Sequence, residues 1–249
     1  AEEFGFAEHV TDWRALLADP RIELFDKINA LPTPPAFVMH TGDLTHGQKP
    51  GAFDTVSEAL KGTKAERIFY IPGENDVFAD GGKEYLGRFG GPAGTGWQSF
   101  DYQGVHFIGL VNVLNFKAGG LGSLGPAQLD WLKKDVEGLA SSTPVVVFAH
   151  VPLWAVYPKW GWVTDDGGQA LSYLKRFGSV TVLNGHIHQI MQKVEGNIAF
   201  HTAMSTAWPQ PAPGAADSTS PLAVSWMRRR ATAGSAASGA TFARAHGMV

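Results

Sequence analysis

Short apolar runs alternate with amphipathic stretches along most of this chain. Runs rich in Val, Ile and Phe predict strands, and stretches with apolar residues three and four positions apart predict helices. Regular alternation of the two is typical of a layered α/β fold. The predicted strands are Ala36–His40, Arg67–Ile71, Val105–Val111, Val145–Ala149, Val180–Leu183, Ile190–Val194 and Ile198–His201, and the predicted helices are Pro20–Ala30, Ala52–Leu60, Pro126–Leu139 and Gln169–Phe177.

Four of the predicted strands run directly into polar residues. In open α/β sheets, ligand sites lie beyond the carboxyl ends of the strands, so we expect these four segments to converge although they are distant in sequence. The transitions are AFVMH into TGDLTH, RIFYI into PGEND, VVVFA into HVPLW and VTVL into NGHIH.

The composition is that of a globular protein. The chain has 249 residues, of which 44% are hydrophobic and 17% are charged. A chain of this balance and length can bury a core, and we expect a single domain over residues 1–227. Residues 228–249 begin with an Arg triplet and continue with Ala, Gly and Ser, which predicts a low-complexity C-terminal tail with little to bury.

Charge and composition exclude several function classes. The formal net charge is −3, so no basic field exists to bind nucleic acid. No apolar run approaches the roughly 18 to 20 residues needed to span a bilayer, and we expect a soluble protein. The chain has no Cys, so any metal ion must be bound by His, Asp, Glu or Asn.

The segment Asn184-Gly185-His186-Ile187-His188 is the most specific short motif. In an extended conformation, residues i and i+2 project to the same side, so His186 and His188 could reach one metal ion or two adjacent ions. Taken alone, such a motif binds metal in only about half of chance occurrences.

The other strand exits offer compatible ligands. Asp43 could bridge two ions with its two oxygens, Glu74 could supply a further carboxylate, and Asp76 could hold a neighbouring group in place. His150 ends an apolar strand, where a histidine alone is more often a hydrogen-bonded core residue than a ligand. Four such exits in one chain make coincidence a poor explanation. Mixed nitrogen and carboxylate ligands favour Mn, Fe or Zn over Ca or Mg.

Two alternative chemistries lack their motifs. A serine hydrolase of the nucleophile-elbow type requires Gly-x-Ser-x-Gly, which the chain does not contain. The glycine-rich segment GGLGSLG at residues 119–125 lacks the lysine and the preceding strand of a phosphate-binding P-loop. Metal-assisted hydrolysis is therefore the favoured chemistry.

The ordered series GDLTH, GEND, AHVP and NGHIH resembles the calcineurin-like metallophosphoesterase superfamily, and especially its bacterial exported members, in which the second block reads GEHD. The resemblance extends from about Ala36 to Pro213. It implies a four-layer α/β/β/α sandwich of two mixed β-sheets flanked by helices, with a dinuclear metal site at the strand ends. It also suggests an exported or periplasmic location, while a cytoplasmic one stays open.

The resemblance also implies roles for particular residues. Asp43 would bridge the two ions, and Glu74, His150 and His186 would complete the coordination of one of them. His188 would bind the other ion. His46, three residues after Asp43, matches a ligand or ligand-supporting position in some relatives.

Two departures from the family pattern matter. The family opens with an Asp-x-His motif that binds the first ion, and the N-terminal segment AEEFGFAEHV does not contain it, so we expect the chain to begin just downstream of it. Asn75 stands where the family has a histidine that steadies the phosphate and protonates the leaving group, and an amide cannot transfer a proton at neutral pH. A shifted register, with Asn75 as the ligand in place of Glu74, is the less favoured alternative.

Two functional hypotheses follow. The first is hydrolysis of a small phosphomonoester or phosphodiester by metal-activated water, with Asn75, Asp76 and His46 beside the metal ligands in the catalytic machinery. The second is a degenerate or truncated relative that binds one ion, or a phosphate-bearing ligand, with little catalysis. Neither hypothesis needs nucleic acid or a membrane, and the sequence does not indicate an oligomeric state.

Overall fold

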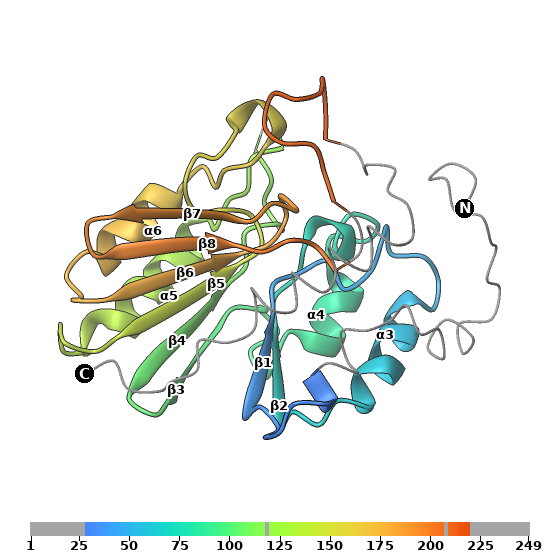
Figure 1. Ribbon diagram of the computed structural model, residues 1–249, viewed down its shortest axis with the longest axis horizontal. Coiled ribbons are helices and arrows are strands. Elements are labelled where there is room, and N and C mark those ends of the chain that lie inside the picture. Colours follow the sequence, from blue (N-terminus) through green and yellow to red (C-terminus); the bar gives the residue numbers. More distant parts are fainter. Residues whose placement is uncertain (1–27, 118–119, 207–208, 220–249) are drawn as a thin grey trace.

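Two β-sheets packed face to face form the centre of the molecule (Figure 1). The structure is a computed structural model that describes residues 28–117, 120–206 and 209–219. Its strands are β1 (Phe37–His40), β2 (Arg67–Tyr70), β3 (Gln98–Tyr102), β4 (Val105–Leu110), β5 (Val145–Ala149), β6 (Val180–Asn184), β7 (Met191–Glu195) and β8 (Ile198–Thr202). Its α-helices are α3 (Ala52–Lys61), α4 (Lys83–Phe89), α5 (Pro126–Glu137) and α6 (Gly167–Leu174), and the short 3₁₀ helices are η2 (Glu74–Asp76) and η4 (Pro158–Trp160).

The larger sheet is mixed. Its strand order is β3-β4-β5-β6-β8-β7, and the β4–β5, β5–β6 and β6–β8 pairs are parallel, whereas β3 and β7 join the two edges in antiparallel pairs. The smaller sheet consists of β1 and β2 in a parallel pair. Parallel pairing places the ends of β1 and β2 together, and likewise the ends of β5 and β6.

Aromatic side chains fill the space between the two sheets. Phe69 of β2 stacks on Phe100 of β3 with ring centroids 3.7 Å apart, and Phe37 of β1 meets Phe107 of β4 edge-on at 5.2 Å. Burial of such rings, with favourable ring geometry, is a major contribution to core energy. The two sheets therefore share one apolar layer.

Helices cover the outer faces of both sheets. The buried core between the larger sheet and its helices contains Leu132 of α5 and Leu174 of α6, neither of which is exposed. On the smaller sheet, Phe89 of α4 lies 5.0 Å from Tyr70 of β2, and Figure 1 shows α3 and α4 on that side. The arrangement is the predicted four-layer α/β/β/α sandwich.

The predicted elements within the described residues are all present, with no end displaced by more than three residues. Helix α5 begins at Pro126, which occupies its first turn as expected. Strand β3 and helix α4 were not predicted. Of the predicted helix Pro20–Ala30 only the last three residues are described, and the tail at 228–249 and the domain boundary at 227 lie outside the described residues.

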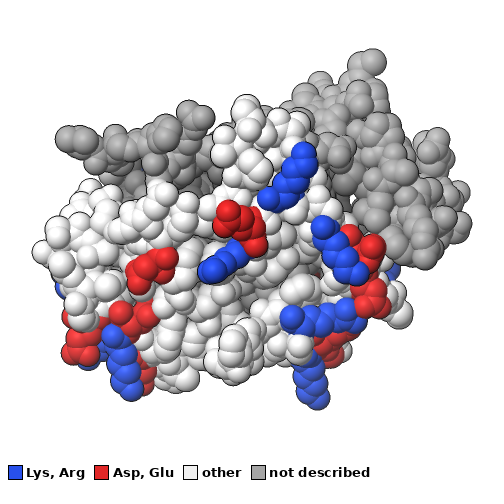
Figure 2. Space-filling model, turned by 90° about the horizontal axis from the view of Figure 1, so that it is seen from below, with Lys and Arg blue, Asp and Glu red and all other residues white. Residues whose placement is uncertain are grey.

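Two surface observations bear on partners. Among the described residues, no helix is both long enough and apolar enough to cross a bilayer. Acidic and basic side chains of the described residues lie interspersed on the face shown in Figure 2, where these residues form no patch of a single sign.

Candidate metal centre

Four strand exits meet at one place between the two sheets. The segments after β1 and β2 bring Asp43 and Glu74, and those after β5 and β6 bring His150 and His186. Backbone contacts tie the exits together, because Gly185 N–H donates to His150 O at 3.1 Å and Ile71 N–H donates to His40 O at 3.2 Å. The expected convergence of the four polar segments is present in the fold.

Three side chains form a group that fits one metal ion. Ligand atoms of Glu74, His150 and His186 all lie within 4.8 Å of one another. Glu74 Oε2 lies 2.8 Å from His150 Nε2 and 3.0 Å from His186 Nδ1. Burial alone would raise the pKa of Glu74, but the neighbouring imidazoles His186 and His150 outweigh it and hold that pKa well below its usual value.

His150 is oriented as a metal ligand. Its Nδ1–H donates to the carbonyl oxygen of Thr41 at 2.6 Å, which leaves Nε2 directed into the site. Nε2 is buried and has no hydrogen-bond partner despite its closeness to Glu74. Burial alone would lower the pKa of His150, but the carboxylates of Asp43 and Glu74 outweigh it and raise the pKa to about 10. Nε2 and the two carboxylates that it faces are together the nitrogen and oxygen ligands that divalent metal ions prefer. This donor set therefore fits a divalent ion.

Asp43 lies at the edge of the three-ligand group. Its Oδ2 is 3.7 Å from His150 Nε2. Its backbone is left-handed, with φ of 56°, a conformation that non-glycine residues adopt rarely and at an energetic cost. Burial is the main reason that the pKa of Asp43 lies above its usual value, and Glu74 adds to it, whereas His150 and the donors of Asn75 lower it.

Two glycines allow the close approach. A Cβ on Gly42 would lie 2.4 Å from His150 Nδ1, and a Cβ on Gly73 would lie 2.1 Å from Asp43 Oδ1. Neither distance is possible for real atoms. The glycine before each carboxylate is therefore required by packing at the site, as well as by turn geometry at Gly42, whose φ is +98°.

The loop after β1 and the turn after β2 are joined by reciprocal hydrogen bonds, in which a carboxylate of each segment accepts from donors of the other. Asp43 accepts hydrogen bonds from Asn75 N–H at 3.0 Å and from Asn75 Nδ2–H at 2.9 Å. In return, the fully buried Asp76 accepts from Leu44 N–H at 2.9 Å, from Thr45 N–H at 2.8 Å and from Thr45 Oγ1–H at 3.0 Å. With a fourth bond from Gly73 N–H at 3.0 Å, both oxygens of Asp76 are fully used, so Asp76 anchors the loop that carries Asp43 and has no capacity left for a substrate.

The His-x-His motif does not have the expected extended conformation. His186 and His188 have φ of 65° and 50°, so both are left-handed, and the buried Ile187 lies between them. The expected extended backbone was wrong here, because the chain turns directly after Gly185. His46 is exposed and His188 half-buried, and neither belongs to the three-ligand group found in the described part of the chain.

Two other groups near the strand ends have structural roles. Asn112 is fully buried and bonds Val151 O at 2.7 Å and Thr164 Oγ1 at 2.8 Å, so it is part of the core and not of a pocket wall. The aromatic loop after His150 caps the core: Trp162 is buried, and the ring centroids of Trp154 and Phe200 lie 4.9 Å apart.

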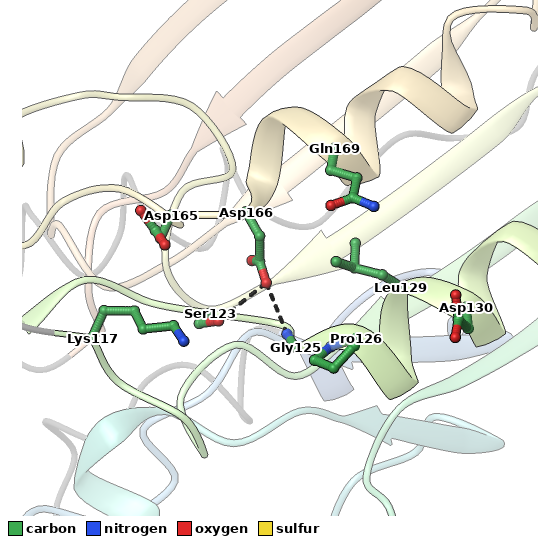
Figure 3. Close-up of a pocket in the computed structure, with 9 residues that line it drawn as sticks. All are labelled: Lys117, Ser123, Gly125, Pro126, Leu129, Asp130, Asp165, Asp166 and Gln169. Atoms are coloured by element: carbon green, nitrogen blue, oxygen red, sulfur yellow. Dashed lines mark hydrogen bonds between the residues drawn. The ribbon is translucent and has the colours of Figure 1, made fainter.

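A hollow of about 310 Å³ lies between the starts of α5 and α6, apart from the metal centre (Figure 3). Asp166 in its wall accepts from Ser123 Oγ–H at 3.1 Å and from Gly125 N–H at 2.8 Å, which ties the start of α5 to the start of α6. Asp166 therefore stabilises the starts of both helices. None of the lining residues is a member of the metal centre.

Sequence reasoning missed the contribution of Thr41. No feature of the sequence marks a backbone carbonyl as the group that fixes the tautomer of His150. Gly42 and Gly73 could have been found from the sequence, since each stands directly before a carboxylate of the site.

A two-sheet sandwich with histidines and carboxylates clustered at its strand ends fits the class of metal-dependent hydrolases. A family model, calcineurin-like phosphoesterase, matches residues 9–190. The chain belongs to this family and is a phosphoesterase. A search of curated proteins finds no sequence match.

Comparison with solved structures supports the fold. A dimetal phosphatase from Danio rerio is 15% identical, with a TM-score of 0.55 over 76% of this chain and 77% of that chain. A phosphopantetheinyl hydrolase from Mycobacterium tuberculosis is 13% identical, with a TM-score of 0.47 over 72% of this chain and 83% of that one. The likeness to the Danio rerio phosphatase shows that the two proteins share a fold.

Proposed function

We propose that this protein hydrolyses a small phosphate monoester or diester with the help of divalent ions. The observation that carries the proposal is the group of Glu74, His150 and His186, with Asp43 at its edge, at the strand ends of a calcineurin-like phosphoesterase. When bound, Mn, Fe or Zn ions would polarise the phosphoryl oxygens and lower the pKa of a bound water. The residues of the chain would hold and orient these ions.

The side chains that hold an ion in this proposal come from both sheets. Glu74 and Asp43 supply oxygen ligands, and His150 and His186 supply nitrogen ligands. Without a cation, these two half-buried carboxylates would repel both each other and an anionic phosphate ester. The ion is therefore needed for binding of the substrate as well as for the reaction.

His188 and His46 are proposed for a second ion or for contact with the phosphate, on the strength of the family resemblance. Asp76 is proposed to act indirectly, because its oxygens already hold Leu44 and Thr45. The loop that it anchors carries both Asp43 and His46.

A degenerate relative that binds a single ion is the second candidate. Two observations favour it: only one three-ligand group is found among residues 28–117, 120–206 and 209–219, and Asn75 cannot protonate a leaving group. Such a protein would bind one ion per chain and turn over slowly.

Metal analysis and hydrolysis assays decide between the two candidates. The purified chain is tested for bound metal by mass spectrometry and then for hydrolysis of p-nitrophenyl phosphate and bis(p-nitrophenyl) phosphate with added Mn, Fe or Zn. We expect turnover that EDTA abolishes and that Glu74→Gln reduces, while the exposed control Glu66→Gln leaves turnover unchanged. One ion per chain with negligible turnover would favour the second candidate, and no bound ion with no turnover would reject both.

A further inference from the structure

Asn75 holds both oxygens of a single carboxylate. Its backbone N–H donates to Asp43 Oδ1 and its side-chain Nδ2–H donates to Asp43 Oδ2, at 3.0 and 2.9 Å. Two donors from one residue fix both the position and the rotation of the carboxylate plane. Asp43 cannot turn about its Cβ–Cγ bond without breaking at least one of these bonds.

The oxygen that the amide holds is the one that faces the metal centre. Asp43 Oδ2 lies 3.7 Å from His150 Nε2, the buried nitrogen that has no hydrogen-bond partner. A carboxylate oxygen has two lone-pair directions, so a hydrogen bond from Asn75 leaves the second direction of Oδ2 available to a cation.

We propose that Asn75 is a positioning residue, whose amide turns Asp43 Oδ2 toward the ion that Glu74, His150 and His186 hold. This inference rests on the proposed function only for the presence of a divalent ion at that place. Asn75 then contributes to ion affinity through geometry, by supporting a ligand that it does not replace.

The surroundings of Asp43 explain why it needs such support. Glu74 has the same charge and belongs to the same site, so repulsion favours an Asp43 carboxylate turned away. The space beside Oδ1 is open only because residue 73 is glycine. A neutral donor on both oxygens counters the repulsion without adding a positive charge that would compete with the ion.

Ion affinity of three variants tests the proposal. Asn75→Leu keeps the approximate volume and removes the amide, whereas Asn75→His keeps a donor, because Nδ1 of histidine lies as far from the backbone as Nδ2 of asparagine. Asn29→Leu is the matched control, since Asn29 also makes two side-chain hydrogen bonds, at 2.8 Å to Gly62 O and at 2.8 Å from Lys64 N–H, in a segment outside the metal centre. The full-length chain is stripped with chelator, and binding of Mn²⁺ is measured by isothermal titration calorimetry.

Loss of a group that orients a metal ligand typically weakens binding roughly 10- to 100-fold. We expect that loss for Asn75→Leu, affinity within about threefold of the parent chain for Asn75→His, and unchanged affinity for Asn29→Leu. The melting temperature of each variant in EDTA identifies any loss of folding. If Asn75→Leu does not fold, the comparison of Asn75→His with the parent chain decides.

Two results would overturn the inference. One is an Asn75→Leu variant that binds Mn²⁺ as tightly as the parent chain. The other is an Asn75→His variant that melts like the parent chain but has lost Mn²⁺ affinity. Neither result depends on turnover, so a parent chain that binds Mn²⁺ but hydrolyses no ester would reject the proposed function and leave this test intact.

Discussion

Glycine at positions 42 and 73 determines how closely the segments of the metal centre approach. Gly73 has an ordinary extended backbone, with φ of −99° and ψ of 177°, so a substitution there tests close approach alone. We expect Gly73→Ala to lower the free energy of unfolding by about 1–3 kcal/mol through overpacking and to impair Mn²⁺ binding, because the new Cβ displaces Asp43. Urea denaturation and calorimetry measure the two effects.

Gly42→Ala and Gly47→Ala separate close approach from backbone strain. Both glycines are left-handed, with φ of +98° and +72°, but a Cβ would strike His150 at position 42 and meet no atom within 4 Å at position 47. A left-handed alanine costs roughly 1–2 kcal/mol. Gly47→Ala should lose about that much and bind Mn²⁺ normally, whereas equal losses at 42 and 47 would contradict the packing argument.

Asp76 gives a second prediction at the residue scale. In Asp76→Asn, the new Nδ2–H₂ group would face backbone N–H donors of Leu44, Thr45 or Gly73 in place of an acceptor. We expect a loss of about 1–3 kcal/mol in the free energy of unfolding, because a buried donor is left unpaired.

Asp130→Asn is the control for Asp76→Asn, since Asp130 is exposed. Urea denaturation of both variants in EDTA keeps metal binding out of the comparison. Equal stability of the two variants would mean that Asp76 does not anchor the loop.

Residue identities at the site were more predictable than their conformations. Asp43, Glu74, His150 and His186 could be proposed because each follows a strand, and strand direction alone brings such ends together. The left-handed turns at His186 and His188 could not be predicted, because nothing in the local sequence distinguishes a turn after Gly185 from a continued strand. The reciprocal hydrogen bonds, from Asn75 to Asp43 and from Thr45 to Asp76, join segments about 30 residues apart. They likewise could not be predicted from the local sequence.

At the scale of elements, an ionic cluster joins the edge of the larger sheet to α5. His106 of β4 lies between two carboxylates, with Nδ1 at 2.8 Å from Asp101 Oδ1 and Nε2 at 2.9 Å from Asp135 Oδ2. Ser99 Oγ–H donates to the other oxygen of Asp135 at 2.6 Å. Both ring nitrogens face acceptors, so the protonated imidazole is the form that fits.

This cluster makes stability depend on pH. The hydrogen bond to Asp135 is the main reason that the pKa of His106 is raised, with Asp101 adding to it against the effect of burial. Because the pKa is higher in the folded state, the stabilisation is fully present below the unfolded value of about 6.5 and is lost as pH rises through the folded value.

Asp135→Asn tests this dependence. We expect the difference in free energy of unfolding between the parent chain and the variant to be largest near pH 5.5 and to shrink toward pH 9, as measured by urea denaturation in EDTA. Groups that titrate elsewhere affect the free energy of unfolding of both chains equally, so their contributions cancel in this difference. A difference that stays constant over this range would show that His106 is not charged in the fold.

The missed elements β3 and α4 have a common cause. Strand β3 reads QSFDY, with only two aromatic residues among polar ones, and gains its order from pairing with β4 in register Phe100↔Phe107. Helix α4 reads KEYLGRF between glycines, and its buried Tyr85 packs against Phe53 of α3. Both depend on partners elsewhere in the chain, whereas α5 could be predicted from its own apolar spacing.

At the scale of the whole molecule, the metal centre lies where the two sheets meet. Asp43 and Glu74 follow strands of the smaller sheet, and His150 and His186 follow strands of the larger one. An ion bound by all four would therefore link the sheets in addition to the aromatic layer between them. The division of the strands into two sheets followed from the family resemblance and not from the strand pattern, which is compatible with a single sheet.

A linking ion should stabilise the entire fold against unfolding. A ligand that binds only the folded state at a concentration 100 times its dissociation constant adds about 2.7 kcal/mol. For a chain of this size, that corresponds to an increase in melting temperature of roughly 5–10 °C. We expect Mn²⁺ to raise the melting temperature of the chelator-treated chain by this amount, and EDTA to reverse the increase, as followed by circular dichroism. In Glu74→Gln the increase should vanish, because the ion loses the carboxylate that contacts both imidazoles, while Glu66→Gln should retain it. An equal increase in all three chains would place the stabilising ion somewhere other than the junction of the two sheets.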